Sequence, residues 1–448
     1  MGKEVDSSWD KEIEMMDKSY HLENKKFVLS ISYGNYQKFV GGTDKVIIAQ
    51  KNALKKEGVS YVYLYPRVSR FYHFWEIIID DEFLGIIDTN SFLQLIIKFI
   101  EEDQCILQGM YIHHLLKANL NDIRLIFNKI QMSIILYIHD YYMICENYFL
   151  LKNGKQYCGA GKVCSEKCKV NGTCSSFQKA IPRSKEIEQF LKYYKERITC
   201  IAPSAFAGNL FQSTYSFLSN QIQIVPHLIL HGEFQKEESD IQNDRPVRIA
   251  YLGQQISMKG WEVYKQFVER TQDSQEYEYH YFGTGKEAMS GVHYHEVSFQ
   301  KKGSNAMVDA LRKHQIDAVF LYSIWPETYS FTYYESMAAN CYVITNKNSG
   351  NIADQVLKNR NGTVYENDTE IMNDSIKEKI GIWKKSGNLG PEWMEENNKN
   401  LFTDKNVAVV MQEYVIKPKR LVQVAINILQ ISIDIKRRLF RMKRKLRG

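Results

Sequence analysis

Two separate stretches of the sequence alternate between short apolar runs and amphipathic segments. In the first stretch, the apolar run 27–32 precedes a glycine-bearing loop, a helical pattern over 44–57 that Gly58 closes, and a second apolar run over 61–65. Strand, loop, helix and strand in this order form a parallel βαβ unit. Because parallel strands need crossover helices on the faces of their sheet, the pattern restricts the chain to α/β folds.

A polar linker at 233–245 separates the two alternations. After it, the pattern restarts with a strand at 248–252, a loop at 253–259 and a helix at 261–271. The other expected strands are 86–87, 105–108, 134–138, 198–201, 223–225, 277–282, 317–321 and 342–345, and the other expected helices are 91–101, 112–119, 185–196, 304–314 and 332–340. Two such units predict two Rossmann-like doubly wound lobes facing each other across a cleft, with ligands beyond the carboxyl ends of the strands.

The domain boundaries follow from this alternation. We predict a polar lead-in over 1–24, an N-terminal lobe over 25–240 with a cysteine-bearing insertion at 153–180, and a C-terminal lobe over 246–400. A chain of 448 residues is long enough for two cores. Apolar residues make up 44% and charged residues 25%, as in soluble proteins. The sequence has no run of 18 apolar residues and no amino-terminal signal pattern, which favours a cytoplasmic body.

The end of the sequence is strongly basic. Residues 417–448 hold eleven Lys or Arg and one acid, Asp434; this tail carries +10, and the net charge of +6 leaves −4 for the rest. From Leu421 to Leu446, apolar residues form a seam at helical spacing. After a connecting helix at 401–416, we predict a basic amphipathic helix that binds an anionic membrane surface. A helix packed on the body or on a second subunit is the alternative, and the acidic body argues against a nucleic-acid partner.

The most specific segment places two glutamates eight positions apart, Glu327 in a loop after a strand and Glu335 in the helix that follows. If this helix begins near Ser330, its unpaired backbone N–H groups form an anion site at the strand end. Glu335 would then accept hydrogen bonds from a ribose diol. The simpler interpretation is that both carboxylates are solvated groups flanking a helix.

This segment resembles the E-x7-E motif of the retaining glycosyltransferases of family 4, which have the two-lobed GT-B fold. Further matches follow in the family's order along nearly the whole chain. They are Gly41-Gly42, Ile138-His139-Asp140, Ala202-Pro203-Ser204, Val225-Pro226-His227, the loop Gly253–Gly260 and Asn361-Gly362. The match ending at His227 is imperfect. In the loop after Gly253, the family's arginine is Gln254, which removes one positive charge from the leaving-group site.

The resemblance implies roles for individual residues. His139 would lie near the transferred sugar, Glu327 near the donor sugar hydroxyls, and Lys259 beside the departing diphosphate, whose charge it would neutralise. The residues implied in donor binding are Gly41, Gly42, Gly253, Gln254, Tyr329, Ser330, Phe331 and Glu335. Taken alone, the glycine pair is also typical of a tight turn, His139 of a structural histidine, and Lys259 of a solvated surface lysine.

The resemblance also implies a reaction. A sugar would pass from a nucleotide-sugar donor to a saccharide or lipid-linked acceptor, with retention and without a cofactor or divalent metal. The expected setting is cell-surface polysaccharide assembly at the cytoplasmic face of the membrane. Gln254 keeps open the alternative of a catalytically silent sugar-nucleotide-binding or scaffold subunit. A Rossmann dehydrogenase is disfavoured, because no G-x-G-x-x-G follows an initial strand.

Four cysteines cluster in the insertion: Cys158, Cys164, Cys168 and Cys174. Four thiolates suit Zn²⁺ in number, but the C-x2-C pairs of zinc ribbons do not occur. A structural zinc site, disulfide or redox chemistry, and reduced thiols are therefore all open interpretations.

Overall fold

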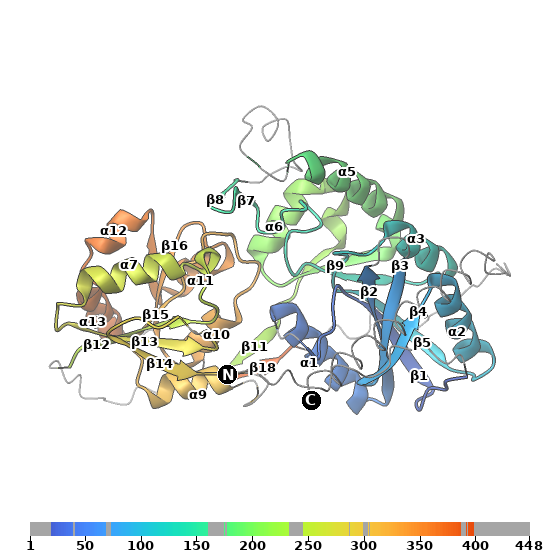
Figure 1. Ribbon diagram of the computed structural model, residues 1–448, viewed down its shortest axis with the longest axis horizontal. Helices are drawn as coiled ribbons and strands as arrows, with labels where there is room; N and C mark the ends of the chain where they lie inside the picture. The colour runs from blue at the N-terminus through green and yellow to red at the C-terminus, as the bar shows by residue number, and fades with distance from the viewer. Residues whose placement is uncertain are drawn as a thin grey trace, which may run out of the picture.

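The computed structural model describes residues 19–38, 41–68, 73–159, 174, 177–232, 245–285, 287–298, 303, 305–386, 391 and 393–397. These residues form two α/β lobes side by side, which confirms the predicted fold class (Figure 1). The linker 233–244, the expected helix at 401–416 and the basic amphipathic tail 417–448 lie outside the described residues. None of the helices in the described part of the chain combines the length and hydropathy that spanning a bilayer requires.

Within the described residues, the N-terminal lobe contains an eight-stranded sheet in the order β10-β9-β6-β5-β1-β2-β3-β4. Its strands are β1 (Lys26–Ile31), β2 (Val59–Val68), β3 (His73–Ile79), β4 (Glu82–Ile87), β5 (Ile106–Ile112), β6 (Ile134–Tyr137), β9 (Ile198–Ala202) and β10 (Ile222–Ile224). Its helices are α1 (Gly42–Lys56), α2 (Thr89–Glu101), α3 (Leu120–Lys129), α5 (Phe177–Tyr194) and α6 (Ala205–Thr214), with 3₁₀ turns η2 (Lys195–Arg197) and η3 (Ser216–Gln221). Neighbouring strands are parallel except β3, which is antiparallel to β2 and β4. A short hairpin, β7 (Leu151–Lys152) and β8 (Gln156–Tyr157), follows β6.

Helices cover both faces of this sheet, which explains its nearly continuous apolar strands. In β1, Phe27, Leu29 and Ile31 pack into one core with residues of α2, α3 and α5. Val28 points to the opposite face and packs into a second core with residues of α1. A strand buried on both faces has no solvent side, so successive positions are apolar.

The prediction of a helix at 112–119 is wrong. Strand β5 continues to Ile112, and α3 begins at Leu120, where the side chain of Asn119 accepts a hydrogen bond from the backbone N–H of Asn121 at 2.9 Å. Lys117 has a positive φ of 67°, a left-handed conformation that interrupts helical geometry. The apolar spacing in this stretch therefore comes from a strand end and a turn, and the capping asparagine marks the true helix start.

The C-terminal lobe contains, within the described residues, a parallel six-stranded sheet in the order β14-β13-β12-β15-β16-β17. Its strands are β12 (Val247–Leu252), β13 (Tyr277–Gly283), β14 (Val292–Glu296), β15 (Ala318–Phe320), β16 (Tyr342–Asn346) and β17 (Gly362–Tyr365). Its helices are α7 (Trp261–Thr271), α9 (Ala306–Lys313), α10 (Phe331–Ala338), α11 (Asn351–Asn359), α12 (Asp368–Met372) and α13 (Ile376–Ser386), with the 3₁₀ turn η4 (Ser257–Lys259). In chain order this is the 3-2-1-4-5-6 arrangement of Rossmann sheets. The order reverses between β12 and β15, so the loops after these two strands border the crevice where such sheets bind ligands.

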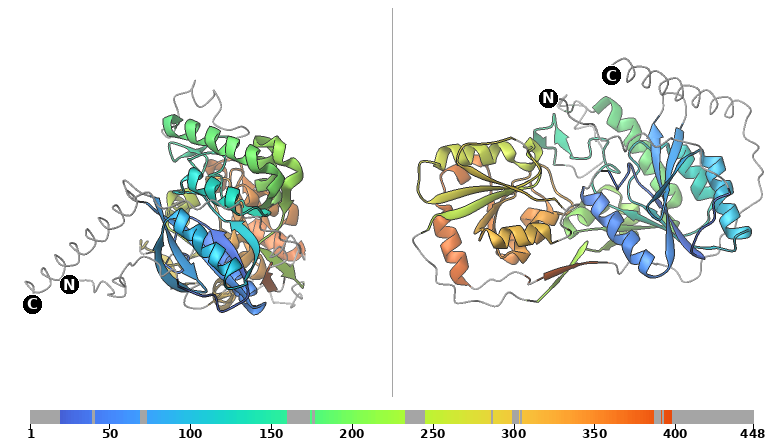
Figure 2. Two further views of the ribbon diagram at one scale, coloured as in Figure 1. Left: turned by 90° about the vertical axis from the view of Figure 1, so that its right-hand side faces the viewer. Right: turned by 60° about the horizontal axis from the view of Figure 1, so that its bottom comes forward.

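A two-stranded ribbon connects the lobes. Strand β11 (Leu228–His231), which leaves the N-terminal lobe, pairs antiparallel with β18 (Trp393–Glu396), which returns from the C-terminal lobe. The right-hand view of Figure 2 shows this ribbon between the lobes. Just beyond β18, the backbone N–H of Asn397 donates to His227 O at 2.9 Å, and its side chain donates to Pro226 O at 2.8 Å.

The loop after β15 docks the C-terminal lobe onto the N-terminal lobe. Trp325 belongs to the hydrophobic core of the N-terminal lobe, where its ring centroid lies 5.0 Å from that of Phe149. The Thr328 hydroxyl donates to the backbone oxygen of His139 at 2.6 Å, and the Ser204 hydroxyl donates to the backbone oxygen of Thr328 at 2.7 Å. The segment between the two lobes is thus held by both apolar burial and hydrogen bonds.

We expect Trp325→Ala to loosen this docking. Removing a buried tryptophan side chain costs roughly 3–5 kcal/mol, so the free energy of unfolding should fall by about that amount. Thermal unfolding and the radius of gyration from solution X-ray scattering would measure the loss of stability and of compactness. Leu357→Ala is the control, because Leu357 is 66% exposed and its truncation should change stability by at most about 0.5 kcal/mol. Equal effects of the two changes would contradict the docking role.

Candidate active site

The loop after β12 brings Lys259 to the crevice of the C-terminal sheet. Gly253 and Gly260 bound this loop, and both have positive φ values, 94° and 84°. A β-carbon at Gly260 would lie 2.2 Å from the backbone oxygen of Tyr322, so only glycine allows the close approach of this loop to the one after β15. Gln254, the residue after Gly253, is exposed.

Lys259 and Glu327 form an ion pair across the two loops. Glu327 is buried, and its backbone is fixed by hydrogen bonds from its N–H to Ser349 O at 3.3 Å and from Asn351 N–H to its own oxygen at 2.9 Å. The Nζ atom of Lys259 also lies 5.4 Å from the centroid of the Trp325 ring. A buried carboxylate needs such a partner, because an uncompensated buried charge is costly.

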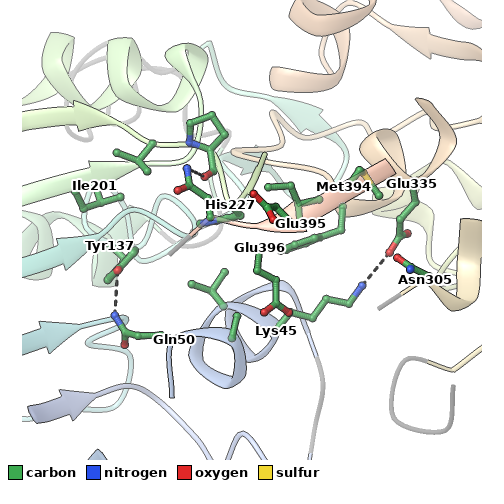
Figure 3. Close-up of a pocket in the computed structure, with 17 residues that line it drawn as sticks. Lys45, Gln50, Tyr137, Ile201, His227, Asn305, Glu335, Met394, Glu395 and Glu396 are labelled. Atoms are coloured by element: carbon green, nitrogen blue, oxygen red, sulfur yellow. Dashed lines mark hydrogen bonds and ion pairs between the residues drawn. The ribbon is translucent and has the colours of Figure 1, made fainter. Parts of the chain in front are cut away.

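The second glutamate lies inside α10. Ser330 is the N-cap, with its hydroxyl accepting from the N–H of Tyr333 at 3.3 Å, so the helix start expected near Ser330 is confirmed. Glu335 is buried, and its Oε1 lies 3.1 Å from Nζ of Lys45 in α1. The Nζ atom of Lys45 also lies 4.9 Å from the centroid of the Phe331 ring. Glu335 and Lys45 therefore form an ion pair between the lobes (Figure 3).

The glycine pair at the start of α1 brings two helix N-termini together. Gly41 is the N-cap of α1, and its N–H donates to Asp44 Oδ2 at 2.9 Å. Burial raises the pKa of Asp44 to about 6. A β-carbon at Gly42 would lie 3.7 Å from the ring of Phe331, the first residue of α10. The positive ends of α1 and α10 thus meet at the interface, where they favour an anion.

Tyr329 supports the chain where it leaves the N-terminal lobe. Its hydroxyl accepts from the N–H of Leu228 at 3.2 Å, and its ring stacks on Tyr334 with centroids 4.4 Å apart. The ring of His227 lies 4.7 Å from that of Tyr329. Tyr329 is buried, so it positions the walls of the site by packing.

His139 follows β6 and belongs to a group of neutral imidazoles. Its Nε2 lies 3.0 Å from Nδ1 of His113, and its ring centroid lies 5.6 Å from that of His227. Burial, with His227 nearby, lowers the pKa of His113 to about 3, and burial lowers the pKa of His227 to about 3. Burial and the neighbouring histidines also hold the pKa of His139 well below its ordinary value. All three rings are therefore uncharged at neutral pH.

A cavity of about 330 Å³ lies between the lobes beside the Lys45–Glu335 pair (Figure 3). Its walls come from α1, from the chain around β11, from β18 and from the start of α10. The lining residues are Lys45, Val46, Ala49, Gln50, Tyr137, Ile201, Val225, Pro226, His227, Leu228, Asn305, Phe331, Glu335, Met394, Glu395, Glu396 and Asn397. Its volume and its mixture of apolar walls with a few polar groups are typical of ligand sites.

The cysteine cluster is only partly described. Cys158 and Cys174 lie within the described residues, whereas Cys164 and Cys168 lie outside them. Within the described part of the chain, no group of three His, Cys, Asp or Glu is arranged to hold a metal ion. The structural zinc site therefore stays an untested prediction.

The sequence interpretation missed three polar residues of the site: Lys45, Gln50 and His113. Lys45 and Gln50 lie on the cavity side of α1, within the helix that the sequence predicted. His113 follows β5, but the strand was expected to end at 108, which placed this histidine in a helix. Histidine directly after a buried strand was the signal that could have found it.

The comparisons with known proteins find similar folds at low identity. No family model and no curated protein sequence matches the chain. A glycosyltransferase from Rickettsia africae ESF-5 is 12% identical with a TM-score of 0.48, over 82% of this chain and 93% of that one. The glycosyltransferase WaaG, involved in lipopolysaccharide biosynthesis, is 12% identical with a TM-score of 0.47, over 81% and 94%. Anabaena Alr3699/HepE, solved with UDP and glucose, is 10% identical with a TM-score of 0.46, over 81% and 93%. Because the sequence identities and TM-scores are this low, the reaction of this chain has to be inferred from its own site.

We expect Lys45→Met to destabilise the protein, because it leaves the buried Glu335 carboxylate without its cation. The loss should be roughly 1–3 kcal/mol, less than for a fully buried pair, since Lys45 is partly exposed. Urea unfolding would measure it, with Lys55→Met at an exposed position of the same helix as the control.

The double change Lys45→Met with Glu335→Gln should recover most of this loss, because it removes both charges together. Strict additivity of the two single changes in a double-mutant cycle would show that the ion pair does not couple the lobes.

Proposed function

We propose that this chain is a glycosyltransferase that moves a sugar from a nucleotide-activated donor to an acceptor bound between its lobes, with retention of configuration. The observation that carries the proposal is the placing of Glu327, Glu335 and Lys259 around the start of α10, at the strand-order reversal of a Rossmann sheet. Nucleotides bind at this position in doubly wound sheets, with phosphates at helix N-termini.

Binding of the donor would replace contacts between protein side chains with contacts to the donor. The ribose diol of the donor would donate hydrogen bonds to Glu335, and these bonds would replace the ion pair between Glu335 and Lys45. Its diphosphate would lie at the N-termini of α1 and α10, within reach of Lys259. These positive ends and the lysine supply an anion site without a metal or cofactor.

The transfer step breaks the bond between the anomeric carbon and the diphosphate oxygen, leaving a short-lived oxocarbenium-like ion pair. Lys259 stabilises the charge that grows on the leaving phosphate, an effect that is strong in a site shielded from water. The acceptor oxygen attacks from the face that the diphosphate leaves, and its proton passes to the phosphate. Glu327 orients the hydroxyls of the donor sugar, and His139 contacts the same sugar from the N-terminal lobe.

The acceptor side of the proposal rests on the sequence. We propose a saccharide or lipid-linked acceptor in cell-surface polysaccharide assembly, with the basic tail 417–448 binding an anionic membrane at the cytoplasmic face. Deletion of this tail should abolish binding to anionic vesicles, and salt should weaken the binding of the intact protein. Vesicle binding that survives the deletion would contradict this part of the proposal.

A catalytically silent donor-binding subunit is the second candidate, which Gln254 motivates. A panel of UDP-, GDP- and dTDP-sugars separates the two candidates. The right donor should raise the free energy of unfolding by about 2.7 kcal/mol at a concentration 100 times its Kd. Slow hydrolysis of that donor supports the transferase, and binding without any hydrolysis or transfer supports the silent subunit. If none of these donors stabilises the protein, both candidates are wrong.

The two charged groups should affect the reaction differently. Glu335→Ala should weaken donor binding by roughly 1.5–3 kcal/mol, the range for hydrogen bonds to a charged group. Lys259→Ala should lower kcat on the order of 100-fold, because its charge matters most as the leaving group departs.

Calorimetric titration of the donor and steady-state kinetics would measure these effects. The control is Lys265→Ala, which removes a lysine of α7 that pairs with Glu262 of the same helix and with Glu287 after β13. Small and equal effects of the Glu335 and Lys259 changes would defeat this assignment of roles.

A further inference from the structure

A chain of hydrogen bonds leads from α1 to His139. It begins at Gln50, a buried residue whose side chain lines the interlobe cavity (Figure 3). The amide oxygen of Gln50 accepts from the Tyr61 hydroxyl at 2.8 Å and lies 3.0 Å from Nε2 of His113. The amide nitrogen of Gln50 donates to the Tyr137 hydroxyl at 3.1 Å. In the structure, the amide oxygen of Gln50 therefore faces His113 and Tyr61, and its amide nitrogen faces Tyr137.

This orientation determines where His113 carries its hydrogen. An amide oxygen can only accept, so Nε2 of His113 must donate to Gln50. Burial lowers the pKa of His113 to about 3, so the ring is neutral and holds a single ring hydrogen. Nδ1 of His113 is therefore an acceptor.

The same reasoning extends one residue further. Nδ1 of His113 lies 3.0 Å from Nε2 of His139, so His139 must donate through Nε2. Because burial and the neighbouring histidines hold the pKa of His139 well below its ordinary value, this ring is neutral too. Its other nitrogen, Nδ1, therefore carries a lone pair. Among the described residues, none forms a hydrogen bond with that nitrogen.

His139 lies where the two lobes meet. Its backbone oxygen accepts from Thr328 of the C-terminal lobe, next to Glu327 in the chain, and the residue as a whole is only partly buried. A lone pair at this place accepts a hydrogen bond from a hydroxyl and repels a carboxylate or a phosphate, whose oxygens also carry lone pairs.

We propose that Gln50 and His113 are positioning residues that fix the tautomer of His139, so that its Nδ1 accepts a hydrogen bond from a hydroxyl of the bound sugar. This inference rests on the proposed glycosyl transfer for its functional part. The tautomer itself is a property of the protein without ligand. The two parts can therefore be tested separately.

The first test is the tautomer in the unliganded, full-length protein. In ¹⁵N-histidine spectra, a ring nitrogen without hydrogen resonates far from one that carries hydrogen, and His139→Gln and His113→Gln assign the signals. We expect hydrogen on Nε2 of both residues. This pattern should persist in Gln50→Glu, because the carboxylate keeps an acceptor at the same place, and should be lost in Gln50→Leu. Hydrogen on Nδ1 of His139 in the native protein would overturn the proposal.

The second test is kinetic, with the donor that the nucleotide-sugar panel identifies. Gln50→Leu should lower kcat roughly 10- to 100-fold, by analogy with the loss of partners that orient a metal-ligating histidine, with a smaller change in KM. Gln50→Glu should restore most of the activity. Tyr61→Phe is the matched control, since it removes a hydroxyl from the same amide oxygen and leaves the bond to His113 intact; its kcat should stay within about twofold.

The outcomes separate the two proposals. A native protein that turns over no donor defeats the proposed function, and the spectra then decide the tautomer alone. A Gln50→Leu variant that is folded and keeps full kcat defeats the positioning role even if the tautomer is as expected. If Gln50→Leu does not fold, His113→Leu breaks the same chain at its next member, and full activity in that variant has the same meaning.

Discussion

The arrangement of this molecule depends on the burial of one loop of the C-terminal lobe in the N-terminal lobe. Trp325 packs into the core of the partner lobe, and Thr328 exchanges hydrogen bonds with His139 and Ser204. Glu327 lies between these two anchors in the chain, so its position is set by both lobes together. Because α10 begins directly after this loop, the same anchoring holds the N-terminus of α10 against that of α1.

Burial also gives the interface its electrostatic character. The carboxylates of Glu327 and Glu335 have little access to water, and each is compensated by a lysine from another segment. A nucleotide-sugar bound as we propose would compete with these lysines, so part of its interaction energy would be spent on exchanging partners.

Much of the fold could be predicted from the sequence, because strands buried on both faces are apolar at successive positions. Helix 261–271 and the N-cap at Ser330 were found through local signals that tertiary contacts did not override. The site was harder to predict. The partner of Lys45 is Glu335, 290 positions away, and the hydrogen on His113 is determined by Gln50, 63 positions earlier. Such pairings follow from the packing of the lobes, which local patterns do not encode.

The ribbon of β11 and β18 has a mechanical consequence. A single linker would let one lobe swivel about the chain, whereas two antiparallel strands with paired positions from Leu228–Glu396 to His231–Trp393 resist torsion. They still permit bending across their width. We therefore expect any separation of the lobes to bend this ribbon across its width and not to rotate one lobe about the chain.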